Sequence, residues 1–190
     1  METRAIEHED QLTGLPDRRF MDKVLDRLIN AGGAFALLFV DLDNFKAVND
    51  TQGHLTGDEV LRGFASLLRR TARDTDFVCR YGGDEFVVLL PVTSDSDAEA
   101  LAERIASAAR DGLGREWGVT ASIGISFFPE DAVTKNDLIS LADQAMYTAK
   151  NSGRSRWCRS HAVTSGLHWN PDVFVGRRSE LERLSTLLPA

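Results

Sequence analysis

The chain has 190 residues, of which 43% are hydrophobic and 27% charged, and its formal net charge is −7. This composition indicates a water-soluble globular domain with a substantial core, and the negative charge argues against a nucleic-acid polymer as partner. The two cysteines, Cys79 and Cys158, form neither a metal-ligand spacing nor a disulfide framework, which fits a reducing cytoplasm. No apolar run reaches membrane-spanning length, and METRAIEHED lacks the apolar core of a signal peptide, so we expect no membrane segment and a cytoplasmic location.

Apolar periodicity predicts alternating helices and strands along the chain. Glycines, prolines and the Ser94-Asp95-Ser96 sequence mark their ends, as turn and cap residues do. Two short strands flank the GGDE sequence at the separation of a β-hairpin. In chain order we expect a helix over 20–29, a buried strand over 34–40, a helix over 60–68 capped by Thr56 or Asp58, strands over 77–81 and 86–90, a helix over 96–110, a strand from Val119, and a helix over 138–149.

This order predicts an α/β sandwich in which helices pack on a mixed central sheet. A hairpin requires antiparallel pairing, which excludes a doubly wound parallel sheet. We expect the domain over residues 10–158, after the end of a linker helix over residues 1–9. Residues 159–190 are expected to be a linker and the start of a truncated downstream segment, because FVGRRSELERL resembles the opening of many P-loop ATPase modules.

Four carboxylates lie at the ends of two of these strands. Strand alternation puts Asp41 and Asp43 on one face and Leu42 on the other. A polar strand end would explain the first pair, and a solvated hairpin tip would explain Asp84 and Glu85. Together, however, they offer oxygen ligands from separate segments, as Mg²⁺ requires, and the adjacent glycine pair leaves room for a nucleotide.

Several motifs in register resemble the GGDEF family, the diguanylate cyclases. They are DQLTGLPDRRF, DLDNFKAVNDTQGH, the GD at Gly57-Asp58, RYGGDEF and DQAMYTAKNSGR, and they run in order from about Asp10 to Arg154. The first motif has Asp17 where Asn is commoner. The resemblance implies a palm-like fold related to nucleotidyl cyclases and polymerases. It also implies that two GTP molecules are condensed into cyclic di-GMP with release of two pyrophosphates.

The resemblance implies roles for the matching residues. Asp41, Asp84 and the Leu42 carbonyl would bind Mg²⁺ or Mn²⁺, and Glu85 would lie near the ribose 3′-hydroxyl, with its part as general base left open. Substrate binding would involve Asn49 and Asp58 at the guanine edge, the turn of Asn44, Phe45 and Lys46 at the phosphates, the cations Lys150 and Arg154, and the open backbone of Gly82 and Gly83. A carboxylate at 58 would accept from guanine N1–H and its amine, a pair that adenine does not offer.

The same resemblance suggests a second site and a homodimer. One domain would hold one GTP, so bond formation would need two sites face to face. Arg73 and Asp76 resemble the family's Arg-x-x-Asp product-inhibition site, and Arg104 lies roughly where the family often adds another arginine. Without that context RDTD would be an ordinary loop, and Arg104 a solvent-facing helix residue.

Two alternatives remain open from the sequence. Lys150 and Arg154, one helical turn apart at a helix C-terminus, could simply complement the helix dipole. The whole domain could also be a catalytically silent module that binds GTP or cyclic di-GMP as a sensor. Such modules usually have a broken motif, and the intact GGDEF sequence therefore favours an active enzyme.

Overall fold

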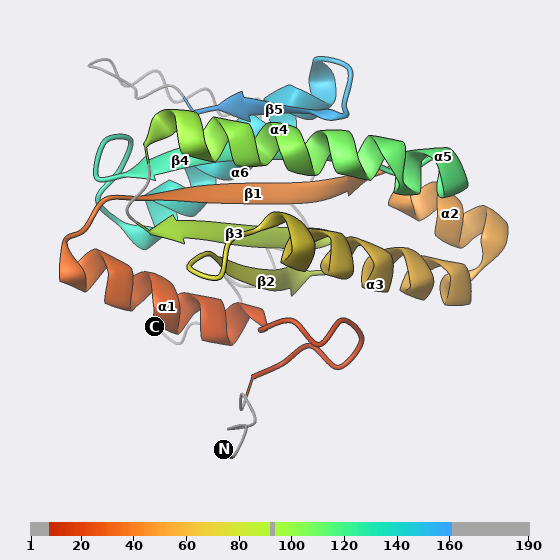
Figure 1. Cartoon of the computed structure of the whole chain (residues 1–190), viewed down its shortest axis with the longest axis horizontal. Coiled ribbons are helices and arrows are strands. Elements are labelled where there is room, and N and C mark those ends of the chain that lie inside the picture. The colour runs from red at the N-terminus through yellow and green to blue at the C-terminus, as the bar shows by residue number, and fades with distance from the viewer. Residues whose placement is uncertain (1–7, 92–93, 161–190) are drawn as a thin grey trace, which may run out of the picture.

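The computed structural model describes residues 8–91 and 94–160 (Figure 1). All of the predicted helices and strands are present within these residues. The elements are α1 (Arg18–Ala31), β1 (Phe35–Asp43), α2 (Phe45–Gln52), α3 (His54–Thr71), β2 (Phe77–Gly82), β3 (Glu85–Pro91), α4 (Asp95–Asp111), α5 (Leu113–Trp117), β4 (Thr120–Phe128), α6 (Lys135–Asn151) and β5 (Arg156–Arg159). The sequence did not predict α2, α5 or β5, because they are too short to show a clear apolar period.

The strands form one five-stranded sheet in the order β2-β3-β1-β4-β5. The central strand β1 is antiparallel to both β3 and β4, and β2 and β3 form the predicted antiparallel hairpin. The outer pair, β4 and β5, is parallel. The sheet is therefore mixed, as predicted, although its parallel pair depends on a strand that the sequence did not reveal.

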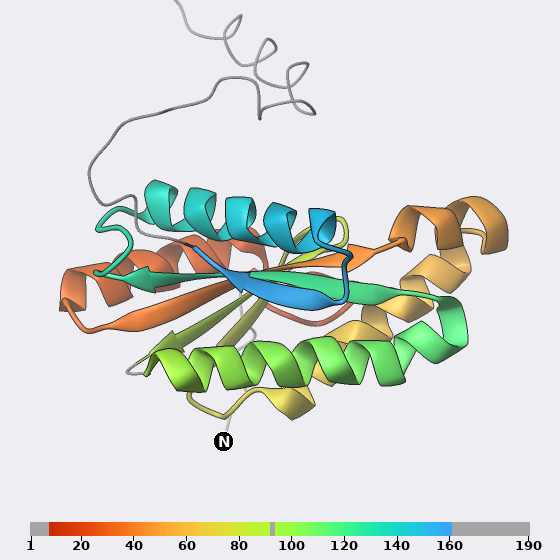
Figure 2. The same cartoon turned by 90° about the horizontal axis from the view of Figure 1, so that it is seen from above.

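Helices cover both faces of the sheet (Figure 2). One core cluster joins alternate residues of β1 to α3 and α4, and the other joins the intervening β1 residues to α1 and α6. Burial on both faces explains why β1 is apolar without interruption until its end. The molecule is thus the predicted α/β sandwich with helices packed on a mixed sheet.

The central strand is longer than the apolar run that predicted it. β1 continues past Val40 to Asp43, because its pairing with β4 extends to the Asp43–Thr120 position. Asp41 and Asp43 are therefore strand residues, and both are buried. Their alternation with Leu42, which lies in the α3/α4 core, confirms the predicted distribution over the two faces.

The predicted cap of α3 is wrong. The helix begins at His54, with Gly53 at its N-cap position, so Thr56 and Asp58 lie inside it. Gly53 also ends α2 and has a φ of 87°, a conformation that favours glycine. Because α2 was not predicted, the sequence offered no sign that a glycine junction between two helices would take the place of a side-chain cap.

Close contact between α6 and β4 fixes where α6 ends. A Cβ atom at Gly124 of β4 would lie 1.9 Å from the Ala142 carbonyl oxygen and 2.3 Å from the Met146 nitrogen, so the helix backbone rests on the strand. The Ser126 hydroxyl also donates to the Leu138 carbonyl oxygen at 2.9 Å. This fit carries the last turn of α6, with Lys150, to the end of the sheet where the acids lie.

The expected domain boundaries fall near the limits of the described residues. Residues 1–7 and 161–190 lie outside them. Most of the predicted linker helix and nearly all of the predicted downstream segment therefore fall outside the described residues. His8 and Glu9 are not helical, and Glu9 forms a β-bridge with Pro16. At the other end β5 runs to Arg159, one residue past the expected boundary. None of the described helices is both long and apolar enough to cross a membrane.

Candidate active site

The predicted acids meet at one end of the sheet. In Figure 1 the arrowhead of β1 points toward α2, and the tip of the β2–β3 hairpin lies at the same end. Asp41 is directly opposite Glu85 in the pairing of β1 with β3. The Leu42 N–H donates to the Asp84 carbonyl oxygen at 3.2 Å. The sheet therefore brings together carboxylates that are more than forty positions apart in the sequence.

Asp41 carries a charge in an unfavourable place. The residue is only 8% exposed, and the Lys150 ammonium lies 2.7 Å from its Oδ1 atom. Burial raises the pKa of Asp41 to about 6, the Lys150 ammonium opposes this rise, and the nearby Asp84 and Glu85 reinforce it. A buried carboxylate surrounded by two further acids is a place where a cation would be stabilising.

The donor set fits a hard divalent cation that also binds substrate. Within the described ranges, no group of three or more acidic, histidine or cysteine side chains forms a ready-made metal cluster. Mg²⁺ needs no such cluster, because it commonly takes one or two carboxylates and completes its shell with phosphate oxygens and water. Asp41, Asp84 and the Leu42 carbonyl offer such oxygens, and the Lys150 ammonium already places a positive charge beside Asp41.

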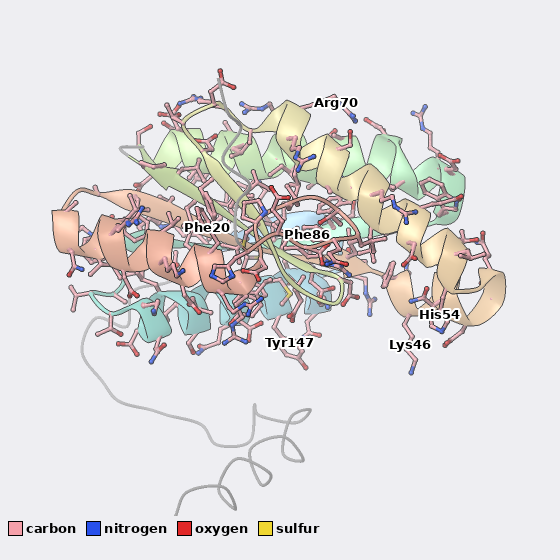
Figure 3. All side chains as sticks on the ribbon, turned by 90° about the horizontal axis from the view of Figure 1, so that it is seen from below. Phe20, Lys46, His54, Arg70, Phe86 and Tyr147 are labelled. Carbon is pink, nitrogen blue, oxygen red and sulfur yellow. The ribbon has the colours of Figure 1, made fainter. Side chains whose placement is uncertain are left out.

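An uncapped helix start lies next to the acids. α2 begins at Phe45, immediately after β1, and no side chain caps its first turn. Asn44, at the N-cap position with a φ of 64°, donates its amide to the Gly118 carbonyl oxygen instead, at 3.3 Å. The first N–H groups of such a helix can bind an anion. Lys46 is exposed here, and in Figure 3 it points away from the fold near His54.

The two predicted guanine-binding residues meet at the junction of α2 and α3. Asn49 is in α2 and Asp58 in α3, and both are half-buried. A Cβ atom at Gly57 would lie 2.0 Å from the Asn49 Oδ1 atom, so the Asn49 amide rests against the α3 backbone just before Asp58. Gly57 thus leaves room for the Asn49 amide against α3, a contact that the sequence motif alone did not explain.

The two predicted phosphate-binding cations differ in position. Lys150 is in the last turn of α6, as expected. Arg154 does not continue that helix, because α6 ends at Asn151 and Arg154 has a φ of 61°. Its Nε atom lies 3.9 Å from Asp43 Oδ1, whereas Lys150 contacts Asp41. The helix-dipole interpretation therefore does not account for Arg154, although Lys150 remains compatible with it.

Arg80 is a site residue for which the sequence gave no role. Its NH1 atom lies 3.0 Å from both carboxylate oxygens of Asp10, and its Nε and NH2 atoms donate to the Gly83 carbonyl oxygen at 3.0 and 2.7 Å. One guanidinium thus ties the glycine turn of the hairpin to the N-terminal loop. Both partners lie in quoted motifs, but nothing in their spacing indicates that residues 70 positions apart would pair.

The predicted product-binding residues form a separate exposed group. Asp76 Oδ2 accepts from the Arg73 N–H at 2.8 Å, which closes the loop between α3 and β2. The Arg73 guanidinium pairs with Asp97 of α4 at 3.1 Å, and Arg104 of α4 donates to the Thr71 carbonyl oxygen at 3.2 Å. Figure 1 places this loop toward the opposite end of the molecule from α2. The structure therefore keeps it apart from the acidic site.

Together the fold and the acidic site define a class of α/β sandwich that carries paired carboxylates on a central strand and a hairpin. A family model described as "Diguanylate cyclase, GGDEF domain" matches residues 7–156, and the chain belongs to this family. The match contains every residue of the acidic site and of the Arg73 loop.

Named relatives support the same assignment. The response regulator PleD of Caulobacter vibrioides is 46% identical over 156 residues, which cover 77% of this chain and 34% of PleD. The GGDEF domain of TpbB from Pseudomonas aeruginosa has a similar structure, with a TM-score of 0.76 and 38% identity over 82% of this chain and 95% of that one. The coiled coil and GGDEF domain of DgcB from Caulobacter crescentus, solved in complex with c-di-GMP, has a TM-score of 0.73 and 32% identity, over 82% of this chain and 87% of that one. The chain spans about a third of the length of PleD.

The raised pKa of Asp41 predicts that this carboxylate destabilises the metal-free protein. Burial moves its folded-state pKa from 3.8 up to about 6, so the unfavourable charge is present above pH 6 and disappears as the pH falls toward 3.8. In EDTA at pH 7.5, Asp41→Asn should therefore be more stable than the unchanged protein by roughly 1–3 kcal/mol. Thermal unfolding measured between pH 4.5 and 7.5 should show that this advantage shrinks at the acidic end.

The exposed Asp111→Asn exchange is the matched control, because a surface carboxylate contributes about 1 kcal/mol or less. A less stable Asp41→Asn protein at pH 7.5, or a stability advantage that does not change with pH, would contradict a raised pKa of Asp41.

Proposed function

We propose that this domain is a diguanylate cyclase, which joins two GTP molecules into cyclic di-GMP and releases two pyrophosphates. Each ribose 3′-oxygen would bond to the α-phosphorus of the other GTP, and each pyrophosphate would leave with the electrons of the broken phosphoanhydride bond. The observation that carries this proposal is the position of Asp41 opposite Glu85 and beside Asp84, with the Lys150 ammonium at 2.7 Å. Membership of the GGDEF family supports this choice of reaction.

The acids would serve as ligands of Mg²⁺ or Mn²⁺. Asp41, Asp84 and the Leu42 carbonyl would hold the ion, which would lower the pKa of the 3′-hydroxyl and stabilise the leaving pyrophosphate. Glu85, opposite Asp41 in the sheet, would lie near that hydroxyl. Lys150, which pairs with Asp41 at 2.7 Å, would exchange this carboxylate for an oxygen of the triphosphate.

The two helices beyond β1 would bind the rest of the nucleotide. The free N–H groups at the start of α2, from Asn44 to Lys46, would bind phosphate oxygens. Asn49 and Asp58 would hydrogen-bond the guanine edge, and Asp58 would favour GTP because adenine offers no donor pair to its carboxylate. Arg154 would add a second cation at the triphosphate, and the exposed backbone of Gly82-Gly83 would leave space beside the sugar.

Catalysis would require a homodimer. Each domain would hold one GTP, so the two reacting nucleotides come together only when two identical sites face each other across a two-fold axis. Because GTP is the substrate, the proposal includes a cytoplasmic location. A sensor without turnover would bind the same nucleotides and form no pyrophosphate.

Turnover separates these two functions. The protein incubated with GTP and Mg²⁺ at high concentration should form cyclic di-GMP and pyrophosphate in a 1:2 ratio, measured by chromatography and a coupled phosphate assay. Asp84→Ala should reduce the rate at least 100-fold, because it removes a proposed metal ligand. Asp111→Ala, an exposed exchange at a residue that pairs with Arg115, should leave the rate within twofold. GTP binding without product would favour the sensor, and an Asp84→Ala protein of full activity would overturn the metal assignment.

We also expect product inhibition through Arg73 and Asp76, with a contribution from Arg104. The Arg73 guanidinium is 58% exposed and pairs with Asp97 at the surface, so it can turn toward a guanine or a phosphate at little cost. Cyclic di-GMP should inhibit the unchanged enzyme, and Arg73→Ala should raise the half-inhibitory concentration at least tenfold. The nearby exposed Arg70→Ala is the control and should change it less than twofold. Equal inhibition of the Arg73→Ala and unchanged enzymes would contradict a product-binding site at Arg73.

A further inference from the structure

The turn after α6 has an unusual backbone. Gly153, Arg154 and Ser155 have φ values of 113°, 61° and 51°. Residues other than glycine rarely adopt such values. This conformation costs on the order of 1 kcal/mol per residue and persists only where surrounding contacts enforce it. Among the described residues, the one other non-glycine residue with a positive φ is Asn44, at the end of β1. Asn44 follows Asp43 in the sequence, and Arg154 and Ser155 contact the Asp43 side chain.

The Asp43 carboxylate holds this turn by a hydrogen bond. Its side chain is fully buried, and both carboxylate oxygens accept hydrogen bonds. Oδ2 accepts from the Ser155 backbone N–H at 3.1 Å and from the Thr120 hydroxyl at 2.8 Å, and Oδ1 accepts from the Ser122 hydroxyl at 2.8 Å. A buried carboxylate with three donors is strongly held, and it can in turn hold a backbone that would otherwise relax.

These contacts make Asp43 unsuitable as a metal ligand but well placed to position the cation Arg154. Its oxygens are occupied by protein donors, whereas Asp41, two residues earlier on the same strand, faces the other acids. The turn that Asp43 holds carries Arg154, whose Nε atom is 3.9 Å from Asp43 and whose side chain is 57% exposed. One strand thus presents a proposed metal-binding carboxylate and, through Asp43, fixes the backbone of a proposed phosphate-binding cation.

We propose that Asp43 is a positioning residue that holds the Gly153–Ser155 turn and thereby sets Arg154 at the triphosphate end of the nucleotide. This inference rests on the proposed GTP site and names a residue that determines triphosphate affinity without touching the substrate. A purely structural role would be different: Asp43 would stabilise the edge strand β5, which follows the turn, and its loss would weaken all nucleotide binding equally.

The test compares a ligand that has the triphosphate with one that lacks it. Binding of α,β-methylene-GTP with Mg²⁺ and of GMP is measured by isothermal titration calorimetry on the full chain. Asp43→Asn should raise the Kd for the triphosphate about tenfold and change the Kd for GMP less than twofold. Arg154→Gln should reproduce this pattern. The variant that combines Asp43→Asn with Arg154→Gln should have a triphosphate Kd at most twofold above that of the weaker-binding single variant. Independent effects would instead multiply to about 100-fold.

Two further variants separate positioning from folding. Asp131→Asn is the matched control, since Asp131 holds the other end of β5 through Ser160 and the Phe127 N–H, and it should change neither Kd. Ser155→Gly added to Asp43→Asn should recover at least threefold of the lost triphosphate affinity, because glycine adopts a positive φ without strain.

Several outcomes would overturn the proposal. It fails if Asp43→Asn leaves triphosphate binding unchanged, or if binding of both ligands falls equally. If Asp43→Asn does not fold, Thr120→Val removes one donor of the same network. It should raise the triphosphate Kd about threefold and leave the GMP Kd unchanged. A triphosphate Kd equal to that of the unchanged protein would contradict the proposal. An unchanged protein that binds neither ligand would overturn the proposed function first, and this inference with it.

Discussion

The proposed active site is arranged around a buried carboxylate near the end of the central strand. β1 pairs on both sides, so the position of Asp41 is fixed by two neighbouring strands at once. Its surroundings raise its pKa to about 6, and burial is the largest cause. The charged form of Asp41 therefore lowers the stability of the folded protein. Lys150 partly offsets this cost, and it lies beside Asp41 because Gly124 lets α6 pack directly on the sheet. A fold that keeps such a charge gives up stability for a function that needs it.

Around this carboxylate, other charged side chains fix backbone rather than contact a ligand. Arg80 ties the Gly83 carbonyl of the hairpin to Asp10 in the N-terminal loop. Asp43 ties the turn after α6 to the sheet through Ser155. Both interactions join segments far apart in sequence and both adjoin residues with a proposed part in binding. Catalytic geometry of this kind depends on supporting contacts, because small displacements of the reacting groups slow a reaction steeply.

Much of the architecture could be predicted from the sequence, and the failures have physical reasons. Long apolar periods predicted the large helices and the strands. Two acidic strand ends suggested that their carboxylates come together, and Asp41 does lie opposite Glu85 in the sheet. Short elements such as α2 and β5 show no clear apolar period. Gly153 indicated the end of α6, but the positive φ values of Arg154 and Ser155 after it are not favoured by either residue type. Long-range pairs such as Arg80 with Asp10 follow from the folded topology, which spacing alone does not contain.

The central claim is that Asp41 and Asp84 together hold a divalent cation that binds the triphosphate. A crystal structure of the protein with Mn²⁺ and a non-hydrolysable GTP analogue tests it most directly, because the anomalous signal of manganese locates the ion. The account predicts one peak within coordination distance of both carboxylates and the Leu42 carbonyl, with Lys150 turned from Asp41 toward a phosphate oxygen. Manganese bound to the phosphates alone, with Lys150 still paired to Asp41, would contradict it.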